Sequence, residues 1–330
     1  MLRSMFSGVS GLRTHQNKMD VIGNNIANVN TAGFKSARAT FMDSIYQSIS
    51  NSSAGNTLYG GSNPSQLGYG SQLASVDVNF SASSYEPTGC GTDCMISGNG
   101  FFLVGQKIPT LGAGGDINTS GIQNDTDVAT DVAEDSQANQ LTLTRVGKFT
   151  IDGDGYLVDA NKNVVYGFIQ TDGALAVGDA TWTPNTAQLV PLRVPVDDNG
   201  TEEINYNDDL EPINLTGISI DKNGIVSGTA DDGRIIKFGQ VALANVPNPN
   251  ALENQGNSYY KAVNNTGLVG AYEPGKGTTS ILATNGLEMS NVDLATEFSN
   301  MITTQRGFQA CSKMITVSDE MLQELVNMKR

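Results

Sequence analysis

The two ends of the chain carry matching heptad repeats of apolar residues, separated by the Gly-, Asn-, Ser- and Thr-rich stretch 34–285. The N-terminal repeat consists of Leu2, Met5, Val9, Leu12, Met19 and Ile26, with Gln16 and Gly23 at the remaining positions. The C-terminal repeat consists of Leu294, Phe298, Met301, Gln305, Phe308, Ile315, Leu322 and Val326, with Ser312 and Asp319 as further polar interruptions. A 3.5-residue repeat is typical of helices that pack lengthwise against a partner helix. We therefore expect two terminal helices that pair with each other and with those of further copies.

The charge of the chain excludes several classes of partner. Its 330 residues contain 19 Lys and Arg against 34 Asp and Glu, which gives a net charge of −15. Binding to nucleic acid or to an anionic membrane surface needs clustered Lys and Arg, so neither partner is expected. Residues 1–40 are nevertheless basic and residues 286–330 mildly acidic, which favours lateral pairing of the two ends.

The pattern along the chain predicts an α+β protein in which a coiled-coil domain of N- and C-terminal helices flanks a mainly antiparallel β domain. We expect a coiled-coil helix within 1–33, a linker over 34–75, a β-rich outer domain over 76–285 and a second coiled-coil helix within 286–330. The linker is expected to begin with a short helical continuation around 36–49. The β domain combines alternating runs such as Val76–Phe80 with Asp/Asn-Gly turns, and small insertions are expected at about 105–140 and 178–212. The second helix is expected to start near Ser290, with Ser290 or Asn291 as its cap.

None of the motifs that could support catalysis or metal binding is complete. His15, the only histidine, lies on the first helix, where a surface position is the simplest interpretation. Asp152-Gly-Asp-Gly155 begins like a calcium loop but has Asn163 where the loop needs Glu. Cys90 and Cys94 lack a second ligand pair for zinc, and are expected to be loop residues or a local disulfide. The sequence contains no stretch of 18 apolar residues, so no membrane span is predicted. We expect no catalytic, cofactor or metal site.

Both ends of the sequence also carry a family signature. The run Asn24-Asn-Ile-Ala-Asn-Val-Asn-Thr-Ala-Gly-Phe-Lys35, together with Leu287–Leu294 and Thr304–Gln309, resembles the paired terminal signatures of the bacterial flagellar rod, hook and hook-associated protein family. Gly98–Phe102, Gly147–Phe149 and Asp154–Leu157 resemble the central β domain of that family. The signature residues carried over are Asn24, Asn25, Ala27, Asn28, Thr31, Gly33 and Phe34. The asparagines offer amides that can bond exposed carbonyls or neighbouring subunits.

The resemblance implies a structural protein of the flagellar axis, in which the terminal helices line a tube and the β domain faces outward. The expected function is that of a hook subunit, which forms a flexible tubular joint transmitting torque from rod to filament; a distal rod subunit is the alternative. Implied partners are further copies of the chain, the distal rod, hook cap and hook–filament junction proteins, and the flagellar type III export apparatus. Extracellular localisation without a cleaved signal peptide is implied as well. A β-rich adhesin and an enzyme are the competing classes, but Trp182 offers no aromatic platform and His15 has no catalytic partners.

Overall fold

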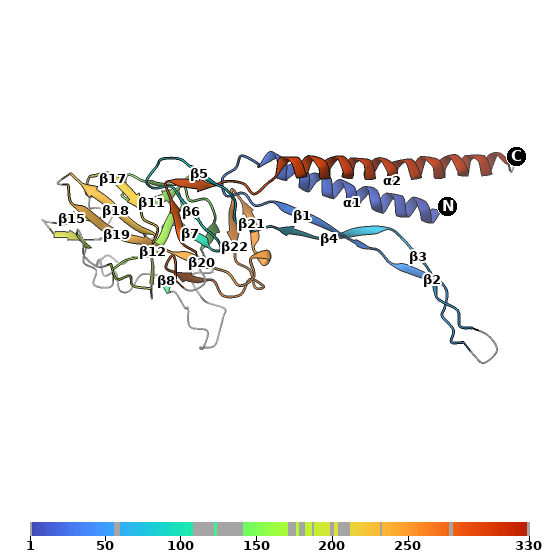
Figure 1. The fold of residues 1–330 in the computed structure, drawn as a ribbon, viewed down its shortest axis with the longest axis horizontal. Helices are drawn as coiled ribbons and strands as arrows, with labels where there is room; N and C mark the ends of the chain where they lie inside the picture. The colour runs from blue at the N-terminus through green and yellow to red at the C-terminus, as the bar shows by residue number, and fades with distance from the viewer. Residues whose placement is uncertain are drawn as a thin grey trace. The chain divides into compact units, whose positions relative to one another are not determined.

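One long helix lies at each end of the chain, and the described residues between them form short antiparallel strands and the loops that join them (Figure 1). The computed structural model describes residues 2–55, 60–107, 122–123, 141–170, 176–177, 182–186, 188–198, 201–203, 212–231, 233–276 and 280–328. The chain divides into two compact units. Unit 1 comprises 1–29, 35–79 and 292–330, and unit 2 comprises 30–34 and 80–291. The α+β class is therefore confirmed.

Unit 1 combines the two helices with two β-hairpin ladders. Helix α1 spans Leu2–Ala27 and helix α2 spans Leu294–Met328. Strand β1 (Ala37–Asp43) pairs with β4 (Ser71–Val78), and β2 (Tyr46–Ser50) pairs with β3 (Ser65–Gly68). All residues of β2 and β3 are exposed within the single chain. A two-stranded ladder alone is marginally stable in water, so the β2–β3 hairpin depends on contacts beyond itself.

The predicted helical continuation around 36–49 is wrong, because this segment forms β1 and β2. The backbone of β1 instead bonds to β4, with a register shift between Thr40 and Phe41, and the Thr40 and Ser75 hydroxyls lie 2.8 Å apart across the ladder. Pairing with a distant strand has overridden the local pattern.

Unit 2 is built around one large antiparallel sheet. In the part of the chain that the structure describes, the sheet has 15 strands, and its main path runs β17-β18-β19-β12-β7-β9-β22-β21. The strands of this path are β7 (Phe101–Gly105), β9 (Thr142–Thr144), β12 (Val164–Phe168), β17 (Leu215–Ile220), β18 (Ile225–Ala230), β19 (Ile235–Val241), β21 (Glu253–Gly256) and β22 (Tyr259–Lys261). Off this path lie β8 (Ile122–Gln123), β10 (Phe149–Ile151), β11 (Leu157–Asp159), β13 (Ala176–Val177), β14 (Gln188–Pro191), β20 (Leu243–Asn245) and β23 (Gly270–Tyr272).

Among its described residues, unit 2 also contains three smaller ladders and one short helix. The ladders join β5 (Tyr85–Pro87) to β25 (Gly286–Glu288), β6 (Cys94–Ile96) to β24 (Leu282–Thr284), and β15 (Val196–Asp198) to β16 (Thr201–Glu203). The 3-10 helix η3 spans Pro249–Ala251. The short antiparallel strands expected of the β domain are present throughout the described part of unit 2. Most of the predicted insertion 105–140, and much of 178–212, lies outside the described residues.

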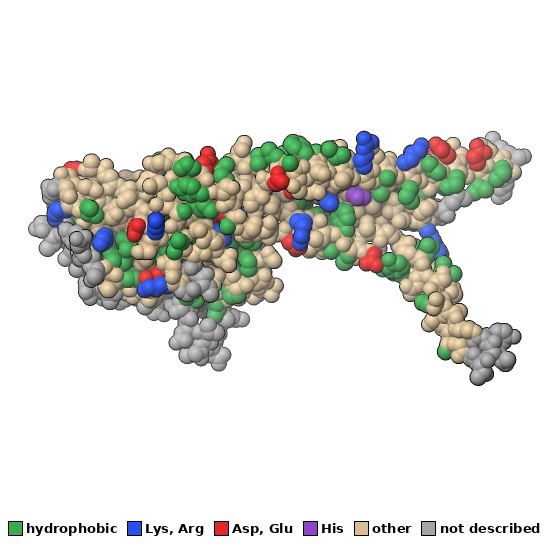
Figure 2. Space-filling model, in the orientation of Figure 1, with side chains coloured by type: hydrophobic (Ala, Val, Ile, Leu, Met, Phe, Trp, Pro, Cys, Tyr) green, Lys and Arg blue, Asp and Glu red, His purple; other side chains and the backbone are tan. Residues whose placement is uncertain are grey.

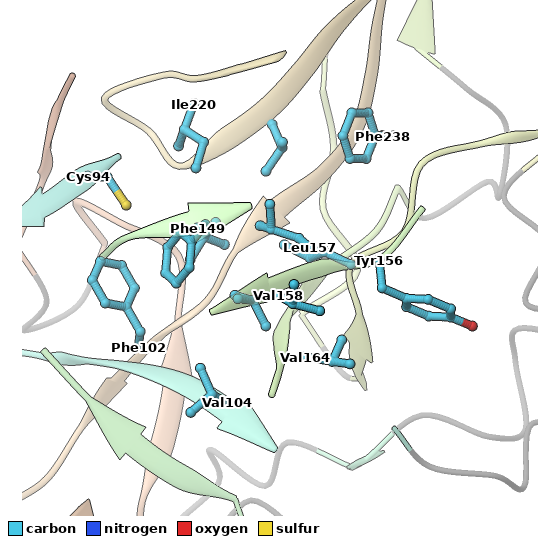
Figure 3. Close-up of a cluster of buried hydrophobic side chains, with 14 of the residues drawn as sticks. Cys94, Phe102, Val104, Phe149, Tyr156, Leu157, Val158, Val164, Ile220 and Phe238 are labelled. Atoms are coloured by element: carbon cyan, nitrogen blue, oxygen red, sulfur yellow. The ribbon is translucent and has the colours of Figure 1, made fainter. Parts of the chain in front are cut away.

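Strand β7 separates two hydrophobic clusters. Because side chains alternate between the faces of a strand, Phe102 and Val104 join one cluster and Phe101 and Leu103 join the other. Figure 3 shows Phe102 and Val104 in the first cluster, near Phe149 from β10. The rings of Phe102 and Phe149 meet edge to face at 5.2 Å. A strand buried on both faces explains the unbroken apolar run Phe101–Val104.

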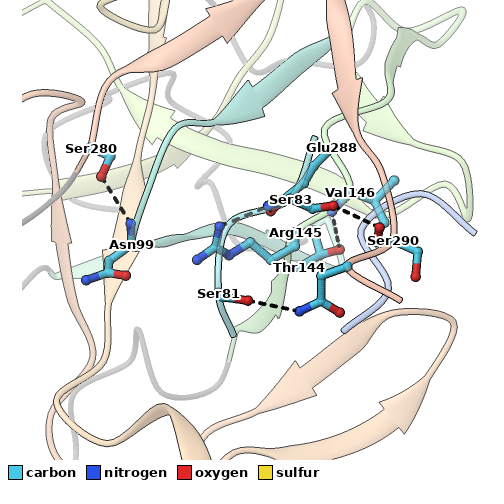
Figure 4. A network of polar contacts seen from close by, with 10 residues as sticks. Ser81, Ser83, Asn99, Thr144, Arg145, Val146, Ser280, Glu288 and Ser290 are labelled. Atoms are coloured by element: carbon cyan, nitrogen blue, oxygen red, sulfur yellow. Dashed lines mark hydrogen bonds and ion pairs between the residues drawn. The ribbon is translucent and has the colours of Figure 1, made fainter. Parts of the chain in front are cut away.

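A buried ion pair fastens the segments where the chain enters and leaves unit 2 (Figure 4). Arg145 Nη1 lies 3.4 Å from Glu288 Oε2, and both side chains are buried. The other carboxylate oxygen of Glu288 accepts a hydrogen bond from the backbone N–H of Ser83 at 3.2 Å, while its backbone carbonyl accepts the N–H of Gly33 at 2.8 Å. Glu288 therefore joins the residues 30–34, 83 and 145, and removing either charge would leave the other buried and unpaired.

Gly147 provides a steric test of this unit. A Cβ at Gly147 would overlap the carbonyl oxygen of Cys94, whereas a Cβ at Gly153 would meet nothing within 4 Å. We expect Gly147→Ala to destabilise the protein by about 1–3 kcal/mol or more, because a backbone atom cannot move aside as a side chain can. Gly153→Ala is the matched control and should change stability by less than about 0.5 kcal/mol. Urea unfolding followed by tyrosine fluorescence measures both, and equal midpoints for the two variants would contradict the packing.

Candidate functional site: the paired helices of unit 1

Helices α1 and α2 run antiparallel and approach closely through three glycines. A Cβ at Gly8 would lie 3.2 Å from Cγ1 of Ile315, and a Cβ at Gly11 would lie 2.9 Å from the sulfur of Cys311. On α2, a Cβ at Gly307 would lie 2.6 Å from Cε1 of His15. Positions 8, 11 and 15 of α1 meet positions 315, 311 and 307 of α2, so the two helices run in opposite directions. Small residues bring helix axes closer than side chains such as leucine allow.

The face of α2 that packs on α1 agrees with the predicted repeat only at alternate positions. At the positions between them, the residue that faces α1 precedes the predicted one by one. Met301, Phe308, Ile315 and Leu322 are half-buried as their place in the repeat suggests, but Leu294, Phe298, Gln305 and Val326 are exposed. The intervening positions belong to Thr304, Cys311 and Ser318, where the prediction placed Gln305, Ser312 and Asp319.

Thr304 and Ser318 can be buried on this face because their hydroxyls bond within their own helix. Each donates to the carbonyl four residues earlier, on Asn300 and Met314 respectively, at 2.7 Å. A buried hydroxyl that is satisfied locally needs no partner across the interface. The sequence signal for these positions is a seven-residue spacing of small residues, Thr304, Cys311 and Ser318, beside the repeat of large apolar side chains.

The predicted apolar repeat of α1 is also only partly covered within the chain. Met5, Leu12, Met19 and Ile26 are half-buried, whereas Val9 is exposed; the side chain of Leu2 lies outside the described residues. The residues that α1 buries are Gly8, Gly11, Thr14, Ile22 and Asn25. The role of either repeat as an interface between copies stays a prediction.

A polar face of α1 contacts the hairpin ladders. Thr14 donates its hydroxyl to the carbonyl of Gly11 at 2.9 Å, and its oxygen lies 3.1 Å from the hydroxyl of Ser71 at the start of β4. Ser10 donates to the carbonyl of Ser7 at 2.9 Å and lies 3.5 Å from that of Tyr69. Helix α1 is therefore held between α2 and the β1–β4 ladder.

Asn25 joins all three parts of unit 1. Its side-chain amide donates to the carbonyl of Ala37 at 2.8 Å, and its carbonyl accepts the N–H of Ala37 at 3.0 Å. The same amide donates to Glu297 Oε1 on α2 at 3.2 Å. With 1% of its surface exposed, Asn25 satisfies both backbone groups of the first residue of β1. The sequence left open whether the amide of this asparagine bonds exposed carbonyls or neighbouring subunits, and within this chain its partners are the backbone of Ala37 and the side chain of Glu297.

The other signature residues have more local roles. Asn28 donates to the carbonyl and side-chain oxygens of Asn24 at 3.0 Å, which closes the last turn of α1. Gly33 has φ 69°, a left-handed conformation that favours glycine, and a Cβ there would lie 2.9 Å from Val146. Thr31 accepts the N–H of Phe34 at its carbonyl, and Ala27 and Thr31 are exposed.

Asp293 caps α2, in place of the predicted Ser290 or Asn291. Its carboxylate accepts the N–H of Ala295 at 3.0 Å and the hydroxyl of Thr296 at 2.6 Å. The hydroxyl of Thr296 and the N–H of Ala295, in that order, hold the pKa of Asp293 below its ordinary value of 3.8. A carboxylate at this end also favours the positive pole of the helix.

Exposed apolar side chains run along unit 1 (Figure 2). Towards the end of α2, Val317, Met321, Leu325 and Met328 follow one another at spacings of three and four, and line a shallow groove with Glu320 and Glu324. Further exposed apolar residues are Phe6 and Val9 on α1, Leu294, Phe298, Ile302, Met314 and Val326 on α2, and Phe41, Met42, Ile45, Tyr46, Ile49, Leu67 and Val76 near the hairpins. Ile45 is 78% exposed and Phe6 is 66% exposed. Continuous apolar faces of this kind mark interaction surfaces.

The described residues contain no cluster of three or more His, Cys, Asp or Glu that could hold a metal ion. Asp152–Gly155 forms a turn in which Asp152 accepts the N–H groups of Gly153 and Gly155. Cys90, Cys94 and Cys311 are free thiols, so the alternative of a local disulfide is wrong. Trp182 donates to Gln240 at 3.3 Å. Within the described residues, no helix is long and apolar enough to cross a membrane.

The fold and these faces define a protein whose two terminal helices form one unit with exposed apolar sides. Residues 5–35 match the family described as flagella basal body rod protein, and residues 284–328 match the family described as flagellar basal body rod FlgEFG protein C-terminal. The flagellar basal-body rod protein FlgG of Bacillus subtilis (strain 168) is 36% identical over 331 residues that cover 100% of both chains. The flagellar hook protein FlgE of Borreliella burgdorferi is 30% identical over 442 residues, again covering 100% of both.

The chain belongs to the family of bacterial flagellar rod and hook proteins, which confirms the resemblance seen in the sequence. A further relative, FlgG of Buchnera aphidicola subsp. Schizaphis graminum, is 31% identical over 330 residues that cover 98% of this chain and 99% of its own. Rod and hook proteins are both among the relatives, so the family does not choose between the two.

Asn25 should be the signature residue on which the stability of unit 1 depends most. Asn25→Ala removes both hydrogen bonds to Ala37 and leaves the part-buried N–H and C=O of that residue without this partner. Each unsatisfied group costs about 1–3 kcal/mol. We expect thermal unfolding, followed by the helical circular dichroism signal, to shift to lower temperature. Asn17→Ala, at an exposed position earlier on α1, is the control and should shift it little; equal shifts would contradict the role of Asn25.

The Asp293 cap should make α2 sensitive to acid. Because the folded pKa of Asp293 lies below its ordinary 3.8, its contribution is fully present above about pH 4 and is lost as pH falls through the folded pKa. We expect Asp293→Asn, which can still cap but cannot titrate, to show a weaker loss of thermal stability between pH 5 and pH 2.5. All other carboxylates are common to both proteins. Parallel pH profiles would show that the Asp293 charge contributes nothing.

Proposed function

We propose that this chain is a structural subunit that polymerises into the axial tube of the bacterial flagellum, with unit 1 as its assembly surface, and that it is not an enzyme. The observation that carries the proposal is the exposed apolar face of α2, where Val317, Met321, Leu325 and Met328 form a regular stripe. Removing these side chains from water stabilises an assembly by roughly 25 cal/mol for each Å² of apolar surface that becomes buried. A second copy offers an equally long helical surface that could bury them.

Charge supports pairing between copies. The apolar stripe of α2 is flanked by Glu320 and Glu324, whereas the exposed apolar residue Phe6 of α1 is flanked by Arg3 and the exposed Arg13 follows two turns later. Opposite charges around an apolar centre favour one orientation of contact and speed association. We infer that α1 and α2 form a coiled coil whose remaining apolar faces contact the helices of neighbouring subunits.

The predicted repeats acquire distinct roles in this proposal. Met301, Phe308, Ile315 and Leu322 serve mainly the contact of α2 with α1 of the same chain, because they share its inward face. Leu294, Phe298 and Val326 are exposed and therefore available to neighbours, as is Val9 on α1. The interface between copies then lies to the side of the predicted seam, along the stripe from Val317 to Met328.

Two positions along the flagellar axis fit the chain. A hook subunit, the expectation from the sequence, is supported by the hook relatives that match over their full length. A distal rod subunit is supported by size: alignment to the rod relative spans 331 residues, whereas alignments to the hook relatives span 442 and 467. In either position the subunit would be exported by the flagellar type III apparatus to the outside of the cell. Its partners would be the neighbouring rod, hook cap and junction proteins.

The assembly surface can be tested without disturbing the fold. Val317→Asn, Met321→Gln and Leu325→Gln place polar side chains on the exposed stripe, so each should change the free energy of unfolding by less than about 0.5 kcal/mol. We expect the triple variant to stay monomeric in sedimentation and electron microscopy at concentrations where the natural chain forms tubes. Gln323→Ala, exposed on another side of α2, should assemble normally. Tubes formed by the triple variant would refute this surface, and removal of residues 1–30 should abolish tubes as well.

An experiment in cells distinguishes a hook subunit from a distal rod subunit. Electron microscopy of basal bodies from a strain lacking the gene should show a complete rod without a hook if the chain is a hook subunit. A truncated rod would instead identify a distal rod subunit. A strain with normal rods and hooks would contradict both.

A further inference from the structure

The only histidine lies where three elements of unit 1 meet, and the proposed function gives it no role. The imidazole of His15 lies over Gly307, since a Cβ there would be 2.6 Å from Cε1, 2.8 Å from Nε2 and 3.2 Å from Nδ1. Its ring also meets that of Phe41 on β1 edge to face, with centroids 5.7 Å apart. His15 therefore fills the space between α1, α2 and β1, and any substitution at Gly307 would displace it.

This position suits the neutral imidazole and not the imidazolium. Within the described part of the chain, Nδ1 of His15 is buried and has no hydrogen-bond partner. Burial, and then the charge of Lys18 one turn later, lower the pKa of His15 below its ordinary value of 6.5. Lys18 Nζ itself lies 5.6 Å from the centre of the Phe41 ring, so a protonated His15 would place a second positive charge beside the same ring.

The other charged groups on the three elements offer the imidazolium little compensation. They are Arg3, Arg13 and Asp20 on α1, Arg38 and Asp43 on β1, and Glu297, Arg306, Lys313, Asp319, Glu320 and Glu324 on α2, together with the thiol of Cys311 on α2. Arg306 donates from Nη1 to Oε1 of Gln309 at 3.4 Å. Among the described groups, Lys18 is the charge that acts on the pKa of His15, and no carboxylate opposes it.

We propose that His15 is an acid-sensitive latch: protonation loosens the packing of α1 against α2 and β1, and assembled subunits then separate in mildly acidic solution. The second clause rests on the proposed polymerisation, whereas the first concerns the single chain. Because the pKa of His15 is lower in the folded chain than in the unfolded one, its contribution is fully present above about pH 6.5. That contribution falls as the pH drops through the folded pKa.

The single chain supplies the first test. Because His15 is the only histidine, one imidazole resonance in the NMR spectrum reports its protonation without assignment. We expect it to titrate below its ordinary range in the natural chain, and closer to that range in Lys18→Gln. Thermal stability should fall with acid more steeply in the natural chain than in His15→Gln, whose side chain is polar but does not titrate. A resonance that titrates normally, with parallel stability profiles, would overturn the latch.

Assembly supplies the second test, with tubes preformed at pH 7.5 and transferred to solutions down to pH 5. We expect the natural chain to lose sedimentable polymer over the acid range in which the resonance titrates, and His15→Gln to retain it. If His15→Gln does not fold, Lys18→Gln takes its place and should lose less polymer than the natural chain. Tubes with the same pH profile in the natural and variant chains would refute the latch alone. Failure of every chain to form tubes at pH 7.5 would refute the proposed function and leave the NMR test to decide the latch.

Discussion

The close antiparallel contact between α1 and α2 is the interaction on which the rest of unit 1 depends. Gly8, Gly11 and Gly307 remove the side chains that would otherwise separate the helices, so that Ile315, Cys311 and His15 reach the opposite backbone. This contact brings the N-terminal and C-terminal helices of a long chain together. It also fixes where Asn25 meets Glu297, and thereby places the family signature at the junction of both helices and β1.

The contact between α1 and α2 leaves apolar side chains exposed on the outer faces of both helices. Small residues such as Gly8, Gly11 and Thr304 alternate with Ile315 and Cys311 in the interface, and many larger apolar side chains of the same helices lie outside it. Val317, Met321 and Leu325 are exposed for this reason, as are Phe6 and Val9. The hairpin of β2 and β3 shares this character, because a two-stranded ladder with no covered face gains little stability within its own chain. Both features agree with a subunit that is completed by neighbouring copies.

The sequence predicted the elements of the molecule better than their contacts. Terminal helices and short antiparallel strands follow from local periodicity and Asp/Asn-Gly turns, so they could be read directly. The inward face of α2 could not, because Thr304 and Ser318 look like surface residues until their hydroxyls are seen to bond the preceding turn. The segment 36–49 was misread as helix because its pairing with β4 is non-local. The hydrogen bonds of Asn25 to the backbone of Ala37 likewise could not be predicted, because they depend on how the chain folds back between α1 and β1.

The central claim is that the exposed apolar stripe of α2 becomes covered when the subunits assemble. Oxidative footprinting measures this directly, because Met321 and Met328 lie on the stripe and report their exposure through the rate of sulfoxide formation. The account predicts rapid oxidation of both in the monomer and strong protection in the tube, with Met42 near the hairpins as an independent reporter of that surface. Tubes in which Met321 and Met328 oxidise as fast as in the monomer would contradict it.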